Sequence, residues 1–166
     1  STMFSVYSSS MIDLNRHFST YIGLTAQYFR LNDNWTVEPR VSLKWKMNRE
    51  QSLAVSYGLH SRRENLDFYF IEKESAGKTL TNKYLNFSKS HHFGLSYSWA
   101  ISPLLHFKVE PYYQYLFNVP VEPGTSFSTI NHIDYYMDRL LVNEGTGRNY
   151  GIDVTLEQYM HKGFYY

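Results

Sequence analysis

The sequence contains no cysteine and no long apolar run. Without thiols, disulfides and thiolate metal sites are excluded. No stretch of 18 apolar residues occurs, so the sequence predicts no transmembrane helix. The chain opens on Ser1-Thr2-Met3 and continues as strand-like sequence, not as a signal peptide. We therefore expect a mature protein or an excised piece, within one domain of 166 residues.

Neither sign of charge predominates in the sequence. The formal net charge is +1, and the 16 basic residues are scattered, so no nucleic-acid partner is expected. No Ser/His/Asp set lies in a nucleophile elbow. The glycines from Gly145 to Gly151 have the wrong spacing for a dinucleotide site, and a strand pattern follows them. The sequence predicts no catalytic residues and no cofactor, and so a protein that is not an enzyme.

Seven histidines raise the question of a metal site. His91 and His92 are adjacent on a strand pattern, so they point to opposite faces and do not both bind one ion in regular geometry. His60 and one of them could meet at the outer rim. Clustered Cys/His/carboxylate ligand spacing is missing, so the sequence predicts no metal site. Whether His60, His91 and His92 bind metal stays open at this stage.

Aromatic residues, by contrast, are abundant at 18% of the chain. The mean hydropathy is nevertheless only -0.44. This combination suits a transmembrane β-barrel, because only every second residue meets lipid and aromatics gather at the two membrane interfaces. A soluble β-protein with a tyrosine-rich core is the alternative.

Strict alternation from Val37 to Met47 favours the barrel. Successive strand residues point to opposite faces, so this stretch has one apolar and one charged face. The apolar parity holds Val37, Pro39, Val41, Leu43, Trp45 and Met47, and the polar parity holds Glu38, Arg40, Ser42, Lys44 and Lys46. Such strands are about twice the usual 5–6 residues. Long strands of this pattern are typical of outer-membrane barrels.

The pattern recurs at even spacing along the chain. Strands are predicted at 4–12, 18–30, 37–47, 51–60, 93–101, 105–117 and 150–157, with the start of another at 164–166. Short turns at 14–17, 48–50, 102–103 and 161–163 alternate with connections at 31–34, 61–84 and 118–148. Long loops on one rim and short turns on the other are typical of an outer-membrane barrel with its short side periplasmic. Pro39 and Pro111 are awkward inside strands, and we expect them near the long-loop ends.

Six stretches, spread over essentially the whole chain, carry a resemblance to a known family. They are Trp35-Thr-Val-Glu-Pro-Arg40-Val-Ser-Leu-Lys, Tyr57-Gly-Leu-His-Ser61, Ser88-Lys-Ser-His-His-Phe-Gly-Leu-Ser-Tyr97, Pro111-Tyr-Tyr-Gln-Tyr115, Asn143-Glu-Gly-Thr-Gly-Arg-Asn-Tyr-Gly151 and Asp153-Val-Thr-Leu-Glu157. These stretches resemble TonB-dependent outer-membrane receptors, most closely the subgroup with an N-terminal carboxypeptidase-regulatory-like domain.

The resemblance implies active uptake of a scarce ligand, such as a metal chelate or a glycan, across the bacterial outer membrane. It also implies lipid around the barrel, a plug linked to the TonB system, and in some members a surface lipoprotein. The family barrel has about 22 strands around a plugged lumen. About seven full strands and the start of an eighth are predicted here, so residues 1–166 are expected to be part of one antiparallel transmembrane β-barrel domain.

Two other functions stay open. One is a small structural or adhesive outer-membrane barrel without active transport, since complete eight-stranded barrels exist. The other is a soluble ligand-binding β-barrel. Three residues after the last turn are too few to cross a membrane, which takes about 9–11 per strand, and this argues against a complete eight-stranded barrel.

The site predictions form two groups. The first group lies on the polar faces and is expected to line the lumen: Glu38, Arg40, Lys44, Lys108, Glu110, Asp153 and Glu157. The second group lies in the two long loops, where aromatic and arginine side chains are common anchors of binding surfaces. It consists of the extracellular ligand candidates Arg62, Arg63, Asp67, Tyr69, Phe127, Tyr135, Tyr136 and Arg139.

Overall fold

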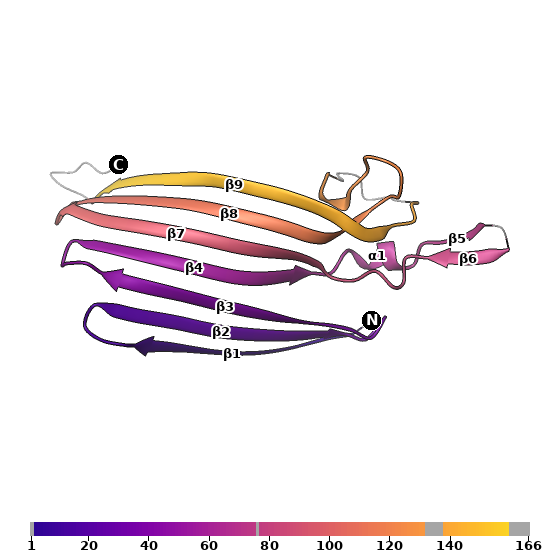
Figure 1. Cartoon of the computed structure of the whole chain (residues 1–166), viewed down its shortest axis with the longest axis horizontal. Helices are drawn as coiled ribbons and strands as arrows, with labels where there is room; N and C mark the ends of the chain where they lie inside the picture. Colours follow the sequence, from indigo (N-terminus) through magenta and orange to yellow (C-terminus); the bar gives the residue numbers. More distant parts are fainter. Residues whose placement is uncertain (1, 76, 132–137, 160–166) are drawn as a thin grey trace.

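A computed structural model describes residues 2–75, 77–131 and 138–159. It consists mainly of one antiparallel sheet of seven long strands in sequence order (Figure 1). The strands are β1 (Met3–Asp13), β2 (Phe18–Phe29), β3 (Asn34–Lys46), β4 (Gln51–Arg62), β7 (Ser88–Ser102), β8 (Leu105–Val121) and β9 (Val142–Gln158). The prediction of seven full strands is confirmed, while residues 164–166 lie outside the described part of the chain.

The connections differ between the two ends of the sheet. Residues 14–17, 47–50 and 103–104 make short turns at one end. The other end carries residues 30–33 and two long connections, which lie together at the right of Figure 1. One long connection contains α1 (Leu66–Tyr69) and a hairpin of β5 (Glu72–Ser75) and β6 (Lys78–Thr81). The other contains the short 3-10 helix η1 (Thr129–Asn131).

The predicted bounds of the long loops need correction. The first connection runs over 63–87 and is not featureless, since it holds α1 and the β5–β6 hairpin. The second runs only over 122–141, because β8 and β9 each reach 17 residues. The added residues of β9, 142–149, are mostly polar or glycine and carry no apolar alternation, while β8 is extended by residues 118–121. These extensions are formed by main-chain pairing of Leu116 with Gly147 and of Pro120 with Asn143.

The alternation predicted from sequence produces two different faces. On one face of the sheet, formed by every second residue, apolar side chains are exposed, including Ile22, Val41, Leu43, Val55 and Leu95. Aromatic residues lie toward the turns (Phe18, Trp45, Trp99) and toward the long connections (Tyr28, Trp35, Phe93). An aliphatic zone between two aromatic zones is the outer surface of a transmembrane barrel. No helix in the described part of the chain has the length and apolar character needed to cross a membrane.

Pro39 and Pro111, the two prolines expected inside strands, each lie where a ladder is interrupted. The β3–β4 pairing ends at Arg40–Gly58, one residue after Pro39, although both strands continue. The β7–β8 pairing is broken between Gly94–Tyr112 and Tyr97–Val109, where Pro111 lies. A proline has no N–H to donate, so it fits a strand only where the ladder is open. Pro111 lies inside β8, not near its long-loop end, which corrects the predicted position.

Candidate functional site

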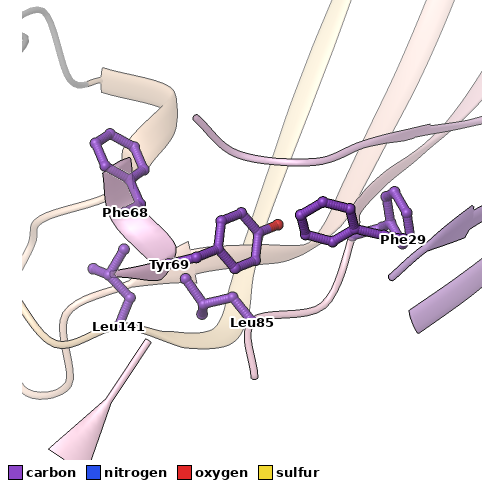
Figure 2. Packing of buried hydrophobic residues seen from close by; sticks show 6 residues of the cluster. Phe29, Phe68, Tyr69, Leu85 and Leu141 are labelled. Atoms are coloured by element: carbon purple, nitrogen blue, oxygen red, sulfur yellow. The ribbon is translucent and has the colours of Figure 1, made fainter. Parts of the chain in front are cut away.

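The two long connections, 63–87 and 122–141, fold together into what we call the loop cap. Its centre is the buried apolar cluster of Phe29, Phe68, Tyr69, Leu85, Phe87 and Leu141, most of which Figure 2 labels. The ring of Tyr69 stands edge-on to that of Phe29 at a centroid distance of 5.3 Å. Phe29 shares the polar face of β2 with Gln27 and Thr25. The cap therefore covers the polar face of the sheet at its long-loop end.

Tyr69 was predicted as a ligand contact, but it is only 2% exposed. Its hydroxyl accepts a hydrogen bond from the Glu64 N–H at 3.4 Å. Burial raises the pKa of the Tyr69 hydroxyl, because desolvation disfavours the phenolate. Tyr69 therefore anchors the cap, and its burial takes it out of the set of exposed ligand candidates.

Asparagine side chains join the connections to one another. The amide of Asn82 donates to the Arg139 carbonyl at 2.7 Å and accepts from the Leu141 N–H at 2.8 Å. Asn143 exchanges two hydrogen bonds with the backbone of Asn86. Asn32, in the shortest of the three connections, donates to the Leu85 carbonyl at 2.8 Å. All three connections are thus fixed relative to one another by side-chain to main-chain bonds.

Ion pairs lie on the outer surface of the cap. Arg139 pairs with Glu122 and lies over the Phe127 ring, with 4.7 Å from its guanidinium carbon to the ring centroid. Lys73 on β5 reaches Asp138 at 3.5 Å. Exposed pairs of this kind contribute only about 0–1 kcal/mol each. These contacts fix the positions of side chains on the cap surface but add little to its stability.

The other ligand candidates have different surroundings. Arg62, Asp67 and Arg139 are exposed, and the guanidinium of Arg63 lies 5.9 Å from the Phe29 ring centroid. Phe127 is half-buried. Tyr135 and Tyr136 lie outside the described residues. Two exposed aromatic residues of the cap, Phe70 and Tyr84, were not predicted, because isolated aromatics in a polar stretch give no periodic signal.

All predicted lumen residues lie on the polar face. Lys108 pairs with Glu110 at 2.8 Å, and Glu110 is directly opposite Asp153 in the β8–β9 register. Nearer the short turns, Lys44, Lys108 and Glu157 line one hollow of about 400 Å³. The face therefore carries mixed charge along its length, as expected of a surface that meets water or a polar partner.

Glu38 has a special position on this face. Its side chain is 2% exposed, and it closes the seam where the β3–β4 ladder has ended. The carboxylate accepts from the Ser61 N–H at 3.0 Å, from Gln27 Nε2 at 3.1 Å and from the Arg40 guanidinium at 3.2 Å. Beside it, the hydroxyls of Thr36 and Ser61 are 2.8 Å apart. Side chains thus replace main-chain pairing along the outer part of this seam.

The histidines divide between the faces as predicted. His91 lies on the apolar face, where Nδ1 is 2.9 Å from the Tyr57 hydroxyl and the ring stacks on Phe117. His92 lies on the polar face beside His60, with ring centroids 4.4 Å apart. Among the described residues, no three His, Cys, Asp or Glu side chains gather as a metal-binding set.

An open, two-faced sheet with long strands and a cap over the polar face at one end defines the wall of an outer-membrane β-barrel. Comparison with solved structures agrees. The chain is similar to the siderophore receptor PirA of Pseudomonas aeruginosa (TM-score 0.72, 11% identity) and to the ferric-catecholate import receptor Fiu of Escherichia coli K12 (0.71, 8%). It is also similar to the FrpB iron transporter of Neisseria meningitidis (0.65, 14%).

Each comparison covers 96% of this chain. The chain spans only about a quarter to a third of those proteins, at 24%, 26% and 32% of their lengths. At such low identity, the likeness shows the fold alone. No family model matches the chain, and no curated protein matches it. The three similar structures are two receptors and a transporter, and none is an enzyme.

Proposed function

We propose that this chain forms part of the barrel wall of a TonB-dependent transporter in the outer membrane of a Gram-negative bacterium. The observation that supports this most is the one-ended cap: two long connections fold over the polar face, while the opposite apolar face stands uncovered. A wall that borders lipid on one side and a gated aqueous passage on the other needs this asymmetry.

In this proposal each surface has a partner. The apolar face contacts lipid, and Glu38, Arg40, Lys44, Lys108, Glu110, Asp153 and Glu157 face the lumen and the plug. The plug connects to the TonB system, which supplies the energy for uptake. Exposed cap residues such as Arg62, Asp67 and Arg139 contact the extracellular ligand, and we propose a surface lipoprotein as a further partner at the cap. From the resemblance noted in the sequence, we further propose that the protein is of the subgroup with a carboxypeptidase-regulatory-like domain.

The two alternative functions fit the structure less well. A small closed barrel needs its first and last strands paired, whereas β1 and β9 are the two edges of the described sheet. A soluble barrel needs its apolar side chains inside, whereas Leu24, Val55 and Ile152 are each at least half exposed.

Single-cysteine labelling tests the orientation, because the chain has no cysteine of its own. Tyr84→Cys places a thiol on the cap, and Arg49→Cys places one on a short turn. In intact cells, a membrane-impermeant maleimide should label residue 84 and not residue 49, and both should react after lysis. The reverse pattern would contradict the proposed topology.

Uptake tests the activity. The similar structures bind or import iron and its siderophore complexes, so radiolabelled ferric catecholate is the first probe. Uptake should fall to background when the full-length protein is deleted, and equally when TonB is deleted. Other chelates and oligosaccharides follow as probes if iron uptake is unchanged. For a probe that needs the protein, uptake that persists without TonB would contradict active transport.

A further inference from the structure

His60 and His92 meet on the polar face although they are not directly paired. In the β4–β7 register, Gly58 lies opposite His92, and His60 lies opposite Ser90. The His60 ring lies back along its own strand over Gly58, so that its Nε2 is 2.9 Å from where a Cβ of residue 58 would be. The missing side chain of Gly58 is what lets the two imidazoles come within 4.4 Å of each other, centroid to centroid.

A chain of amides holds the second ring. Asn149 Nδ2 donates to Gln114 Oε1 at 3.2 Å, and Gln114 Nε2 is 3.3 Å from His92 Nδ1. In this arrangement Gln114 Nε2 donates to Nδ1 of His92, so the ring proton is on Nε2. Metal binding through Nε2 therefore requires both terminal amides to turn over, so that Gln114 Oε1 accepts from Nδ1–H and the Nε2 lone pair is free. An outer hydrogen bond of this kind fixes the ring of a metal-binding histidine.

The pair also stands between two hollows. One, of about 250 Å³, lies under the cap and includes Glu64 and Ile130 in its wall. The other, of about 360 Å³, lies along the polar face and includes Tyr21 and Tyr112. His60, His92 and Gln114 line both. The two imidazoles therefore lie where the capped hollow adjoins the hollow on the polar face.

We propose that His60 and His92 form a two-imidazole binding site for a divalent transition-metal ion, with its remaining coordination positions open. Two nitrogens each about 2.0–2.1 Å from one ion are at most about 4 Å apart, so two imidazoles that share an ion must be neighbours. His60 and His92 are neighbours, with a ring-centroid distance of 4.4 Å. Neutral imidazole binds copper, nickel and zinc, while Mg²⁺ and Ca²⁺ prefer oxygen. Two protein ligands leave room for water or for atoms that arrive with the ion.

Charges of both signs surround the pair. Arg40, which lines the hollow on the polar face, is paired with Glu38, while Arg62 and Lys89 line the capped hollow. The Glu64 carboxylate lies in the wall of the capped hollow and accepts from the Ser88 hydroxyl at 2.8 Å. Metal binding at the pair does not require transport. A role of this metal site in uptake, as a binding site along the transport route, rests on the proposed function.

The test uses the full-length protein folded in detergent, titrated with Cu²⁺ or Zn²⁺ alone. One equivalent of Cu²⁺ should bind more tightly than Zn²⁺, as the Irving–Williams order requires. Nitrogen couplings should appear in the Cu²⁺ electron paramagnetic resonance spectrum, and Mg²⁺ should not compete. Loss of even an outer partner of a ligand costs about 10–100-fold in affinity, so His60→Gln and His92→Gln should each cost at least about tenfold.

Two controls separate the site from general histidine binding. His91→Gln changes the neighbouring residue on the opposite face, and His106→Gln changes a polar-face histidine near the short turns. Both should keep the wild-type affinity. Gly58→Ala keeps both ligands but displaces the His60 ring, so it should weaken binding while the heat-stability of the folded barrel changes little.

Equal affinity in the wild-type protein and in the His60→Gln/His92→Gln double variant would overturn the proposal. So would a spectrum without nitrogen coupling. If the double variant loses the ion but ferric-catecholate uptake stays TonB-dependent, the site is upheld and is not needed for that substrate. If uptake fails in the wild-type protein while the ion still binds, the transport proposal fails and the site stands.

Discussion

The loop cap and the sheet beneath it are stabilised in opposite ways. The cap buries an apolar cluster around Tyr69 and Leu141, as a small soluble domain does. Away from the cap, the sheet has side chains such as Leu43, 43% exposed, and Lys44 on its two faces, and no described residue outside the sheet packs over them. Its strands are held mainly by main-chain ladders. The cap therefore depends on water to drive its packing, whereas the sheet depends on lipid to cover its apolar face.

Mutations should therefore change the stability of the cap and of the sheet in different ways. A side chain lost from the cap leaves a cavity, while a change at an exposed position such as Leu43 or Lys44 acts mainly through the solvent that the position faces. The four predictions that follow test this contrast on the full-length protein, in decreasing order of expected effect.

Tyr69→Ala should destabilise the cap by about 3–5 kcal/mol, as large aromatic truncations in a core do. The sheet should keep its ladder, because Tyr69 contributes nothing to it. Limited trypsin digestion should become faster at Lys83 and Arg139, while the barrel keeps its heat-modifiable mobility on a gel. Tyr84→Ala, at an exposed tyrosine of the same loop, should leave digestion unchanged. Equal resistance to trypsin in the Tyr69 and Tyr84 variants would show that the buried cluster does not stabilise the cap.

Leu43→Arg should cost about 2–4 kcal/mol if residue 43 lies near the bilayer midplane, because a charge on the lipid face must leave water. Lys44→Gln, one residue away on the polar face, should change stability little. Both values come from equilibrium urea unfolding in lipid vesicles. Similar tolerance at the two positions would show that the faces are not different, and would defeat the barrel interpretation.

Asn82→Ala should cost about 1–3 kcal/mol, the penalty for leaving buried backbone groups without a partner. Asn82 is 1% exposed and serves both Arg139 and Leu141, 57 and 59 residues away. Hydrogen exchange should accelerate at the Leu141 amide. Asn131→Ala, at an exposed asparagine of the second connection, provides the matched control. No change at Leu141 would mean that the two connections are not joined through this amide.

Lys73→Met should have the smallest effect, under about 1 kcal/mol, because its ion pair with Asp138 is largely exposed. The rate of trypsin digestion of the cap in low salt, measured at sites other than residue 73, should match that of the wild type. A loss of protection comparable to that of Tyr69→Ala would show that surface charge, not the buried cluster, holds the cap.

Local pattern was sufficient for the sheet and insufficient for the cap. Alternation around Leu43 and Lys44 predicted the faces, the strand count and the segregation of turns from loops. It could not predict the contacts of Asn82 with Leu141, because these join two different connections at a sequence separation of 59 residues. It also missed the polar outer part of β9. There Asn143 and Gly147 are in a strand because they pair with β8, and their own side chains show no apolar alternation.

The histidines show the same limit at the candidate site. Parity placed His91 and His92 on opposite faces, as the structure has them. That His60 reaches His92 follows from Gly58, whose missing side chain matters only once the neighbouring strand is in register.

The seam closed by Glu38 has a genetic consequence. Main-chain ladders consist of atoms that every residue shares, so few point mutations can remove them. Along the outer part of β3 and β4, closure instead depends on side chains, namely the Glu38 carboxylate that holds the Ser61 amide and the hydroxyls of Thr36 and Ser61. A single base change in the codon for residue 38 can therefore remove a contact that holds β3 to β4.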